Sequence, residues 1–136
     1  MSESIRQVDY FYIQTPNKPG EAARALGAIK AAGVNLLAFS GFPSGRRAQL
    51  DFIPADSEAF VKAARKAHLK LSARKSGFFL QGEDRVGAVA DVLGKLAAAG
   101  INVTAIDAVC GGAGRYGAIF WVKPPDRRRA ARALGI

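Results

Sequence analysis

The sequence Asn17-Lys18-Pro19-Gly20, followed by an apolar-striped segment and then Ala31-Ala32-Gly33-Val34-Asn35, occurs twice in this chain. The second copy runs from Asp84-Arg85-Val86-Gly87 to Ala98-Ala99-Gly100-Ile101-Asn102, and each equivalent residue lies 67 positions further along. The glycines and asparagines recur as well as the common alanines. A repeat of this length predicts two copies of one supersecondary module rather than a solenoid.

The first copy has the pattern of a βαββαβ module. Gly, Pro and Asn before an apolar stripe are typical of a turn that opens a helix, with Asn17 as a cap and Gly33 as the residue that ends the helix. Aromatic and β-branched runs predict the strands, and Asp56 or Ser57 can cap the second helix. The expected strands are 8–14, 34–40, 48–53 and 69–73, with a hairpin loop at 41–47.

The second copy repeats this order without its last element. We expect strands at 77–81, 101–108 and 116–122, a helix at 86–99, a flexible loop at 110–114 and a basic helix at 124–134. The sequence then stops at Ile136. The second module therefore lacks its last strand, or borrows one from elsewhere.

This order of elements predicts an α+β fold with two ferredoxin-like βαββαβ modules, each an antiparallel sheet with its helices on one face. The expected domains are residues 1–75 and residues 76–136. Aromatic residues are expected on the face of each sheet away from the helices, namely Tyr10 and Tyr12 in the first copy, and Phe79 and either Trp121 or Phe120 in the second. A neighbouring module, a second subunit or a ligand is expected to cover such a face.

Composition limits the classes of partner. The chain of 136 residues has a formal net charge of +9, which favours anionic partners, although much of it is clustered at 62–75 and 127–132 as a solvated basic face. Cys110 is the single cysteine, so an intrachain disulfide is impossible and a reducing, cytoplasmic location is expected. We predict no membrane association, because no apolar run reaches the length of a membrane span.

The two turns are the best candidates for a binding site. A glycine at a strand-to-helix junction lets a ligand approach the backbone, and the N–H groups of the first helical turn attract a carboxylate. Lys18 and Arg85 can add a positive charge at equivalent positions, and Asn35 and Asn102 offer a donor and an acceptor each. The alternative is that all these residues only cap helices and turn the chain.

Other chemistry finds little support. One histidine, His68, and one cysteine are too few for a zinc site or a redundant Cys–His nucleophile pair. The glycines of 111–114 lack the Lys and Ser/Thr that follow in a P-loop. The sequence therefore predicts no catalytic residues, no metal and no cofactor.

The two copies resemble the opening of an ACT domain, whose pattern is an acidic or Asn residue, a variable position, Pro, Gly, a helix, and then Gly, an aliphatic residue and Asn. The resemblance covers nearly the whole chain in tandem, and Val86 departs from it where Pro is usual. It implies a regulatory module that binds small ligands, usually amino acids, between adjacent modules. The contacts that it implies are Asn17, Lys18, Pro19, Gly20, Asn35 and Leu36 in the first copy, and Asp84, Arg85, Val86, Gly87, Asn102 and Val103 in the second.

Two functions from different classes remain open. The first is a non-catalytic amino-acid-binding regulator, expected to form a homodimer and to control an enzyme in trans. The second is an RNA-binding ferredoxin-like module, favoured by the positive charge and by the run 115–120, which partly resembles an RNA recognition motif. The Pro-Gly turn and the Gly-Val-Asn junction are unexplained by the second hypothesis, so a nucleic-acid partner is not expected. A small metabolic enzyme lacks any supporting acid–base pair.

Overall fold

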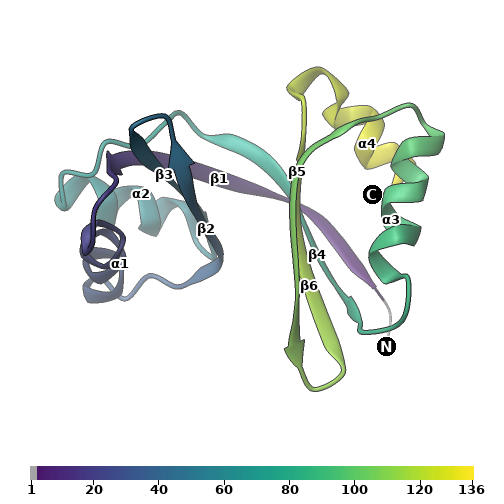
Figure 1. Cartoon of the computed structure of the whole chain (residues 1–136), viewed down its shortest axis with the longest axis horizontal. Helices are drawn as coiled ribbons and strands as arrows, with labels where there is room; N and C mark the ends of the chain where they lie inside the picture. The colour runs from purple at the N-terminus through teal and green to yellow at the C-terminus, as the bar shows by residue number, and fades with distance from the viewer. Residues whose placement is uncertain (1–2) are drawn as a thin grey trace. The chain divides into compact units, whose positions relative to one another are not determined.

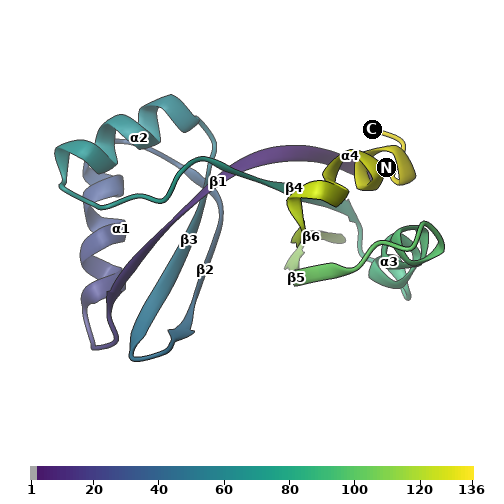
Figure 2. The same cartoon turned by 90° about the horizontal axis from the view of Figure 1, so that it is seen from above.

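The computed structural model describes residues 3–136, which divide into two compact units. One unit is Asp9–Lys75, and the other joins Ser76–Ile136 to the N-terminal residues up to Val8 (Figure 1). Each unit is an antiparallel sheet with two helices on one face, as Figure 2 shows from a second direction. The predicted α+β fold with two ferredoxin-like modules is confirmed.

The unit Asp9–Lys75 has its strands in the order β2-β3-β1. The bounds of its elements are β1 (Ser4–Pro16, shared with the other unit), α1 (Glu21–Ala31), β2 (Leu36–Ser44), β3 (Arg47–Pro54) and α2 (Ser57–Lys66). Along β1, Phe11, Ile13 and Thr15 are buried whereas Gln14 is exposed. This alternation directs one face of the strand at the helices, as expected for an antiparallel sheet with one covered face.

Aromatic rings fill the core of this unit. Phe60 of α2 lies between Phe11 and Phe52, with ring centroids 5.4 Å and 5.2 Å away, and Ile29 of α1 is 1% exposed. Burying a large apolar side chain stabilises the fold by about 1.5–3 kcal/mol relative to leaving it exposed. The core therefore fixes both helices on the sheet, and with them the turn that precedes α1.

The other unit has the strand order β1-β4-β6-β5. Its elements are β4 (Lys75–Glu83), α3 (Ala88–Ala98), β5 (Val103–Gly112), β6 (Arg115–Val122), the short 3-10 helix η1 (Pro124–Asp126) and α4 (Arg127–Ala133). Phe78 and Phe120 stack with their centroids 5.2 Å apart, and Val92 and Leu96 of α3 are buried in the same core.

The N-terminal half of β1 supplies the strand that the second copy lacks. Residues of β1 up to Val8 belong to the unit of Ser76–Ile136, where β1 neighbours β4 and Ile5 packs against the core. The second module thus takes its fourth strand from the beginning of the same chain. The compact units accordingly differ from the ranges 1–75 and 76–136, since the first residues group with the later ones.

The fourth strand predicted at 69–73 is wrong. These residues, all within the described part of the chain, run beside β1 but form no regular ladder. The N–H of Ser72 donates to the Tyr12 carbonyl at 2.8 Å, and the N–H of Tyr12 donates to the Ser72 hydroxyl at 3.0 Å. Because a side-chain oxygen takes the place of a backbone carbonyl, the segment is tied to β1 without becoming a strand.

The predicted loops are also longer than the observed ones. The chain turns at Gly45 and Arg46 rather than over 41–47, and at Ala113 and Gly114 rather than over 110–114. Ala113 and Gly114 both have positive φ, of 56° and 71°, as two-residue hairpin turns favour. Cys110 consequently lies on β5 and not in a flexible loop.

Candidate functional site

The first repeated turn connects β1 to α1. Asn17, Lys18 and Pro19 are exposed, and the helix begins only after Gly20, which is its N-cap at φ 89°. The prediction that Asn17 caps this helix is therefore wrong, because Asn17 lies three residues before the cap. A residue with a side chain is strained at such a φ, so glycine is required at this position for conformational reasons.

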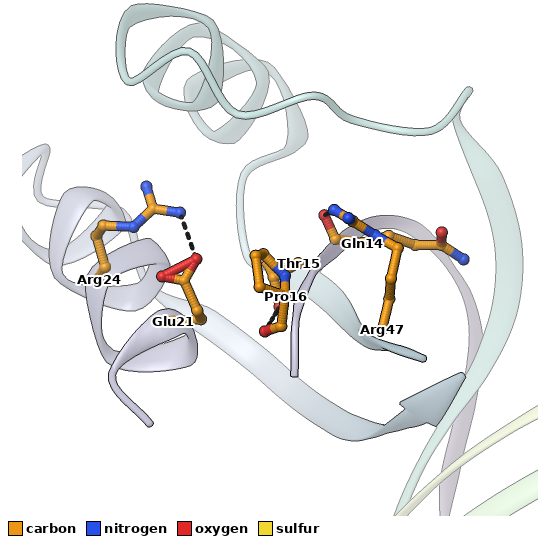
Figure 3. Close-up of polar contacts among 6 residues, drawn as sticks. All are labelled: Gln14, Thr15, Pro16, Glu21, Arg24 and Arg47. Atoms are coloured by element: carbon orange, nitrogen blue, oxygen red, sulfur yellow. Dashed lines mark hydrogen bonds and ion pairs between the residues drawn. The ribbon is translucent and has the colours of Figure 1, made fainter. Parts of the chain in front are cut away.

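Three charged side chains near this turn already have partners, namely those of Glu21, Arg24 and Arg47. The Glu21 carboxylate, in the first turn of α1, accepts a hydrogen bond from Nη2 of Arg24 at 3.4 Å (Figure 3). Nη2 of Arg47 donates to the Gln14 carbonyl at 3.2 Å. Glu21 places a negative charge where the helix would attract an anion. The first turn is thus less suited to a carboxylate than its glycine and lysine predicted.

The second repeated turn connects β4 to α3 with the same backbone. Gly87 is the N-cap at φ 79°, and Ala88 takes the place that Glu21 has in the first copy. Nη2 of Arg85 lies 2.7 Å from the Asp91 carboxylate, and the Val86 side chain is 99% exposed. The N–H groups of the first helical turn have no acceptor within a helix. No acidic side chain occupies the equivalent of Glu21, and the acid of this first turn, Asp91, is paired with Arg85.

A pocket of about 280 Å³ opens at the second turn. Its walls come from the turn, the start of α3, the end of β5 and β6, and they include Asp84, Arg85, Gly87, Val89, Cys110 and Tyr116. The Cys110 thiol donates to the Asp84 carboxylate at 2.9 Å, and the Asp84 N–H donates to the Gly114 carbonyl at 2.9 Å. The pocket therefore combines a held carboxylate, a guanidinium and a helix N-terminus.

The ionisable groups of this pocket are shifted by their surroundings. Burial raises the pKa of Tyr116, and the nearby Glu3 carboxylate, 3.3 Å from the Tyr116 hydroxyl, raises it further. The hydrogen bond to Asp91 raises the pKa of Arg85. Both shifts keep the protons in place at neutral pH, so the pocket presents a neutral phenol and a charged guanidinium.

The predicted strand-start residues lie at the other end of each helix. Gly33 and Gly100 follow α1 and α3 at φ 72°, and in both copies the next residue donates its N–H back to the helix, as from Val34 to Ile29 at 3.2 Å. The expectation that Gly33 ends the helix is confirmed. A pocket of about 420 Å³ lies there in the first copy, and it includes Asn35 and Leu36.

The pocket at the second turn does not include Asn102 or Val103, and the pocket at Asn35 and Leu36 does not include the first turn. Asn17–Gly20 precede α1 whereas Asn35 and Leu36 follow it, and an 11-residue helix is about 16 Å long. In the same way Asp84–Gly87 are separated from Asn102 and Val103 by α3. The turn and the strand start of one copy therefore lie at opposite ends of the same helix.

Sequence reasoning missed two residues of the second pocket. Cys110 was assigned to a loop and Tyr116 only to a strand, yet both line the pocket with Asp84. The register of the hairpin brings them together, because Cys110 pairs with Tyr116 across β5 and β6. The short Ala113–Gly114 turn was the signal that could have revealed this register.

The aromatic residues on the second sheet face separate the two functional hypotheses. Phe79 and Trp121 are 8% and 7% exposed, and Tyr10 and Tyr12 are partly buried. An RNA recognition surface needs exposed rings on which bases stack. The burial of Phe79 and Trp121 therefore disfavours the RNA-binding hypothesis.

Within residues 3–136, no group of three or more His, Cys, Asp or Glu side chains is placed to hold a metal ion. No helix in this range has the length and apolar character needed to cross a membrane.

Two ferredoxin-like modules, each an antiparallel sheet with two helices on one face, define the fold class of this α+β protein. Residues 78–135 match the model of the ACT domain family. The module that these residues form belongs to that family, whose domains are regulatory modules. No curated protein sequence matches the chain.

Several solved structures share the fold at low sequence identity. Protein BT0572 from Bacteroides thetaiotaomicron is 18% identical, with a TM-score of 0.79 over 94% of this chain and 88% of that one. The ligand-free regulatory subunit of aspartate kinase from Thermus thermophilus is 18% identical, with a TM-score of 0.65 over 97% and 93%. A structure of aspartokinase α and β subunits is 17% identical, with a TM-score of 0.62 over 98% and 95%. At this identity the likeness concerns the fold alone.

Proposed function

We propose that this protein is a non-catalytic regulator that binds an amino acid at the turn Asp84–Gly87. The pocket at this turn is the observation that carries the proposal, because it places opposite charges beside a helix N-terminus. An amino acid is a zwitterion, so its site needs a donor set for the carboxylate and an acceptor for the ammonium. The family match over 78–135 supports a regulatory role.

The proposed pose follows from the charges. The ligand carboxylate accepts from the first-turn N–H groups of α3 and from Arg85, while Asp84 accepts from the ligand ammonium. The Cys110 thiol already holds the Asp84 carboxylate from β5. Tyr116 closes the pocket as a neutral side wall, which leaves the ligand side chain to contact Val89 and the end of β5.

We propose that Asp9–Lys75 is a second ACT-like module with a weaker site of the same kind. Its turn residues Asn17 and Lys18 can bind a carboxylate, but Glu21 opposes one and Asn17 lacks the charge of Asp84. The fold likeness to a regulatory subunit of aspartate kinase, which covers nearly the whole of that chain, supports a tandem arrangement.

The strand-start residues are proposed to complete these sites across a homodimer. Asn35 and Leu36, or Asn102 and Val103, would then approach the turn of a neighbouring module and add amide contacts to the ligand. The proposed setting is the cytoplasm, where the dimer would control an enzyme in trans by responding to the level of its amino acid. No cofactor or metal is required for such a response.

A thermal-shift screen of the full chain against the twenty amino acids tests this function. A ligand at 100 times its Kd stabilises the folded state by about 2.7 kcal/mol, so a cognate amino acid raises the melting temperature. We expect one or a few related amino acids to do so. Arg85→Gln should abolish the rise, whereas Arg128→Gln, which removes an equal charge at an exposed position of α4, should retain it.

A short single-stranded RNA, assayed in parallel at two salt concentrations, tests the alternative. A melting temperature that responds to RNA in a salt-sensitive manner and to none of the amino acids would reject the proposal in favour of nucleic-acid binding. An amino-acid response that survives Arg85→Gln and Asp84→Asn would instead place the ligand away from this turn.

A further inference from the structure

A third pocket lies within the unit Asp9–Lys75, and none of its lining residues belongs to either repeated turn. It has a volume of about 390 Å³, in the size range of small-molecule sites. It opens between α2, Phe11 of β1 and the segment 69–74, where the sequence predicted a strand. Ser72 ties this segment to β1 through one backbone hydrogen bond and one bond to its hydroxyl, without a continuous strand ladder.

The bend that forms this pocket is built by His68. His68 has φ 59° and follows α2, so the chain reverses there as it does at Gly33 after α1. The N–H of Leu69 donates to the Ala64 carbonyl at 2.9 Å and the N–H of His68 to the Arg65 carbonyl at 3.0 Å. The segment 69–74 then returns along β1 in a fixed position, so its side chains form a defined wall.

The lining combines apolar surface with positive charge. Phe11, Val61, Leu69 and Leu71 form the apolar part, and the Phe11 ring is fixed by its stacking on Phe60. The guanidinium carbon of Arg74 lies 5.7 Å from the centroid of the Phe11 ring. A ligand in this pocket would therefore meet an aromatic ring and aliphatic side chains, with a cation at their edge.

The two arginines of the pocket differ in their partners. Nη1 of Arg74 lies 3.1 Å from the Asp9 carboxylate, which also accepts from the Ser57 hydroxyl at 2.8 Å. Arg65, in the last turn of α2, makes no ion pair or side-chain hydrogen bond within residues 3–136. The guanidinium of Arg65 is thus a positive charge in the lining that no carboxylate neutralises. No Asp or Glu side chain is among the lining residues.

We propose that this pocket binds a small aliphatic monocarboxylate that has no ammonium group. Its carboxylate would pair with the guanidinium of Arg65, which matches a carboxylate with two parallel N–H donors. Its aliphatic body would lie on Phe11 and Leu71, where apolar surface leaves water. An amino acid is disfavoured because its ammonium would lie beside the cations Arg65 and Arg74, and no carboxylate side chain lines the pocket. This site is independent of the proposed amino-acid site at Asp84–Gly87.

The test compares three molecules with one carbon skeleton by calorimetric titration of the full chain. The probe is 4-methylpentanoate, which is leucine without its ammonium, and the comparisons are leucine and the uncharged 4-methylpentanamide. We expect 4-methylpentanoate to bind and the other two to bind about tenfold more weakly or worse. Amide resonances of Leu71 and Ser72 should shift on addition of the probe.

Matched variants locate the binding. Arg65→Gln should weaken 4-methylpentanoate binding about tenfold or more, since a charged hydrogen bond is lost. Lys66→Gln removes the same charge from the neighbouring position of α2, outside the lining, and should leave the affinity unchanged. Arg85→Gln should also leave it unchanged, so failure here is distinguishable from failure of the proposed function.

Three results would overturn the proposal. The first is that 4-methylpentanoate shows no saturable binding. The second is that leucine and 4-methylpentanamide bind with the same affinity as 4-methylpentanoate. Equal losses in Arg65→Gln and Lys66→Gln would show a general effect of net charge rather than a site.

Discussion

At the scale of single residues, the Tyr116 ring leaves no space for a side chain at Gly82 of β4. A Cβ on Gly82 would lie 2.9 Å from Cε1 of the buried Tyr116 ring. Overpacking of this kind costs about 1–3 kcal/mol. We predict that Gly82→Ala lowers the free energy of unfolding by that amount in urea denaturation.

Gly117 provides the matched control on the neighbouring strand β6. A Cβ there would meet its nearest atom, the Leu80 carbonyl oxygen, at 3.6 Å, which is an ordinary contact. Gly117→Ala should therefore change stability by less than about 1 kcal/mol. Equal losses in the two variants would show that the Tyr116 ring yields freely and would contradict this account.

The protonation of Tyr116 gives a prediction on pH dependence. Burial and the Glu3 carboxylate raise its folded-state pKa above the ordinary value of 10.0. The folded state then binds the proton more tightly than the unfolded state, so stability falls as pH rises from the unfolded pKa through the folded one. We expect the free energy of unfolding to decline above pH 10, and to decline less steeply in Tyr116→Phe.

A second tyrosine also titrates at alkaline pH, so its contribution to stability must be separated from that of Tyr116. Burial raises the pKa of Tyr10 as well, with a further contribution from Asp51, so some decline should remain in the variant. Tyr10→Phe is the parallel variant. Identical pH profiles of the wild type and Tyr116→Phe would show that Tyr116 titrates alike in the folded and unfolded states.

At the scale of elements, the ends of the helices show what the sequence could predict. Gly33 was predicted from local signals as the end of α1, and Asp56 as one of two candidate caps of α2. The structure uses Asp56, whose carboxylate accepts from the Ala59 N–H at 3.1 Å. The helix starts after Gly20 and Gly87 were misplaced by a few residues, because Asn17 resembles a cap that the chain does not use. Residue type alone could not decide which of several turn residues takes positive φ.

The C-terminus of α2 gives a prediction with an internal control. His68 adopts φ 59°, a conformation that costs a residue with a Cβ about 1–2 kcal/mol. We predict that His68→Gly raises the free energy of unfolding by about 1 kcal/mol. Thermal or urea denaturation measures the change.

Gly33 occupies the same position after α1 and should respond in the opposite direction. No atom lies within 4 Å of a Cβ placed there, so Gly33→Ala introduces backbone strain without a clash. The expected loss is about 1–2 kcal/mol. Gains or losses of the same sign in the two variants would contradict the role of positive φ at these helix ends.

At the scale of the whole molecule, local sequence signals could not predict that the first residues of β1 join the sheet of the later unit. The first residues of β1 are mostly polar, so only 8–14 had a strand pattern, and no periodicity reveals which sheet an edge strand joins. The order of elements was predicted from the repeat. The missing strand was also noticed, but its source depended on contacts far apart in sequence.

Removal of this strand segment should therefore weaken the later module. A chain that begins at Asp9 lacks Ile5, which packs on the core of Ser76–Ile136, and exposes the edge of β4. We predict faster amide hydrogen exchange in β4 and β6, with smaller changes in α1 and β3. A uniform increase in both units would show that the two unfold as one and that β1 has no special role in the later module.

The candidate site was predicted in part. The repeat located the turns, and the pocket at the second turn includes Asp84, Arg85 and Gly87. The second turn is the preferred binding site because Glu21 places a negative charge in the first turn of α1. The sequence did not reveal this, because it did not show that the helix begins at Glu21. Cys110 and Tyr116 entered the site through hairpin register, which depends on a two-residue turn.

The central claim is that an amino acid binds at the N-terminus of α3. The most direct measurement is a nuclear magnetic resonance titration of the full chain with each of the twenty amino acids, in which the backbone amides of Val89 and Ala90 are followed. The account predicts that at least one amino acid shifts these amides in a saturable way, and that Arg85→Gln removes the response. Saturable shifts confined to other segments, or none with any amino acid, would contradict it.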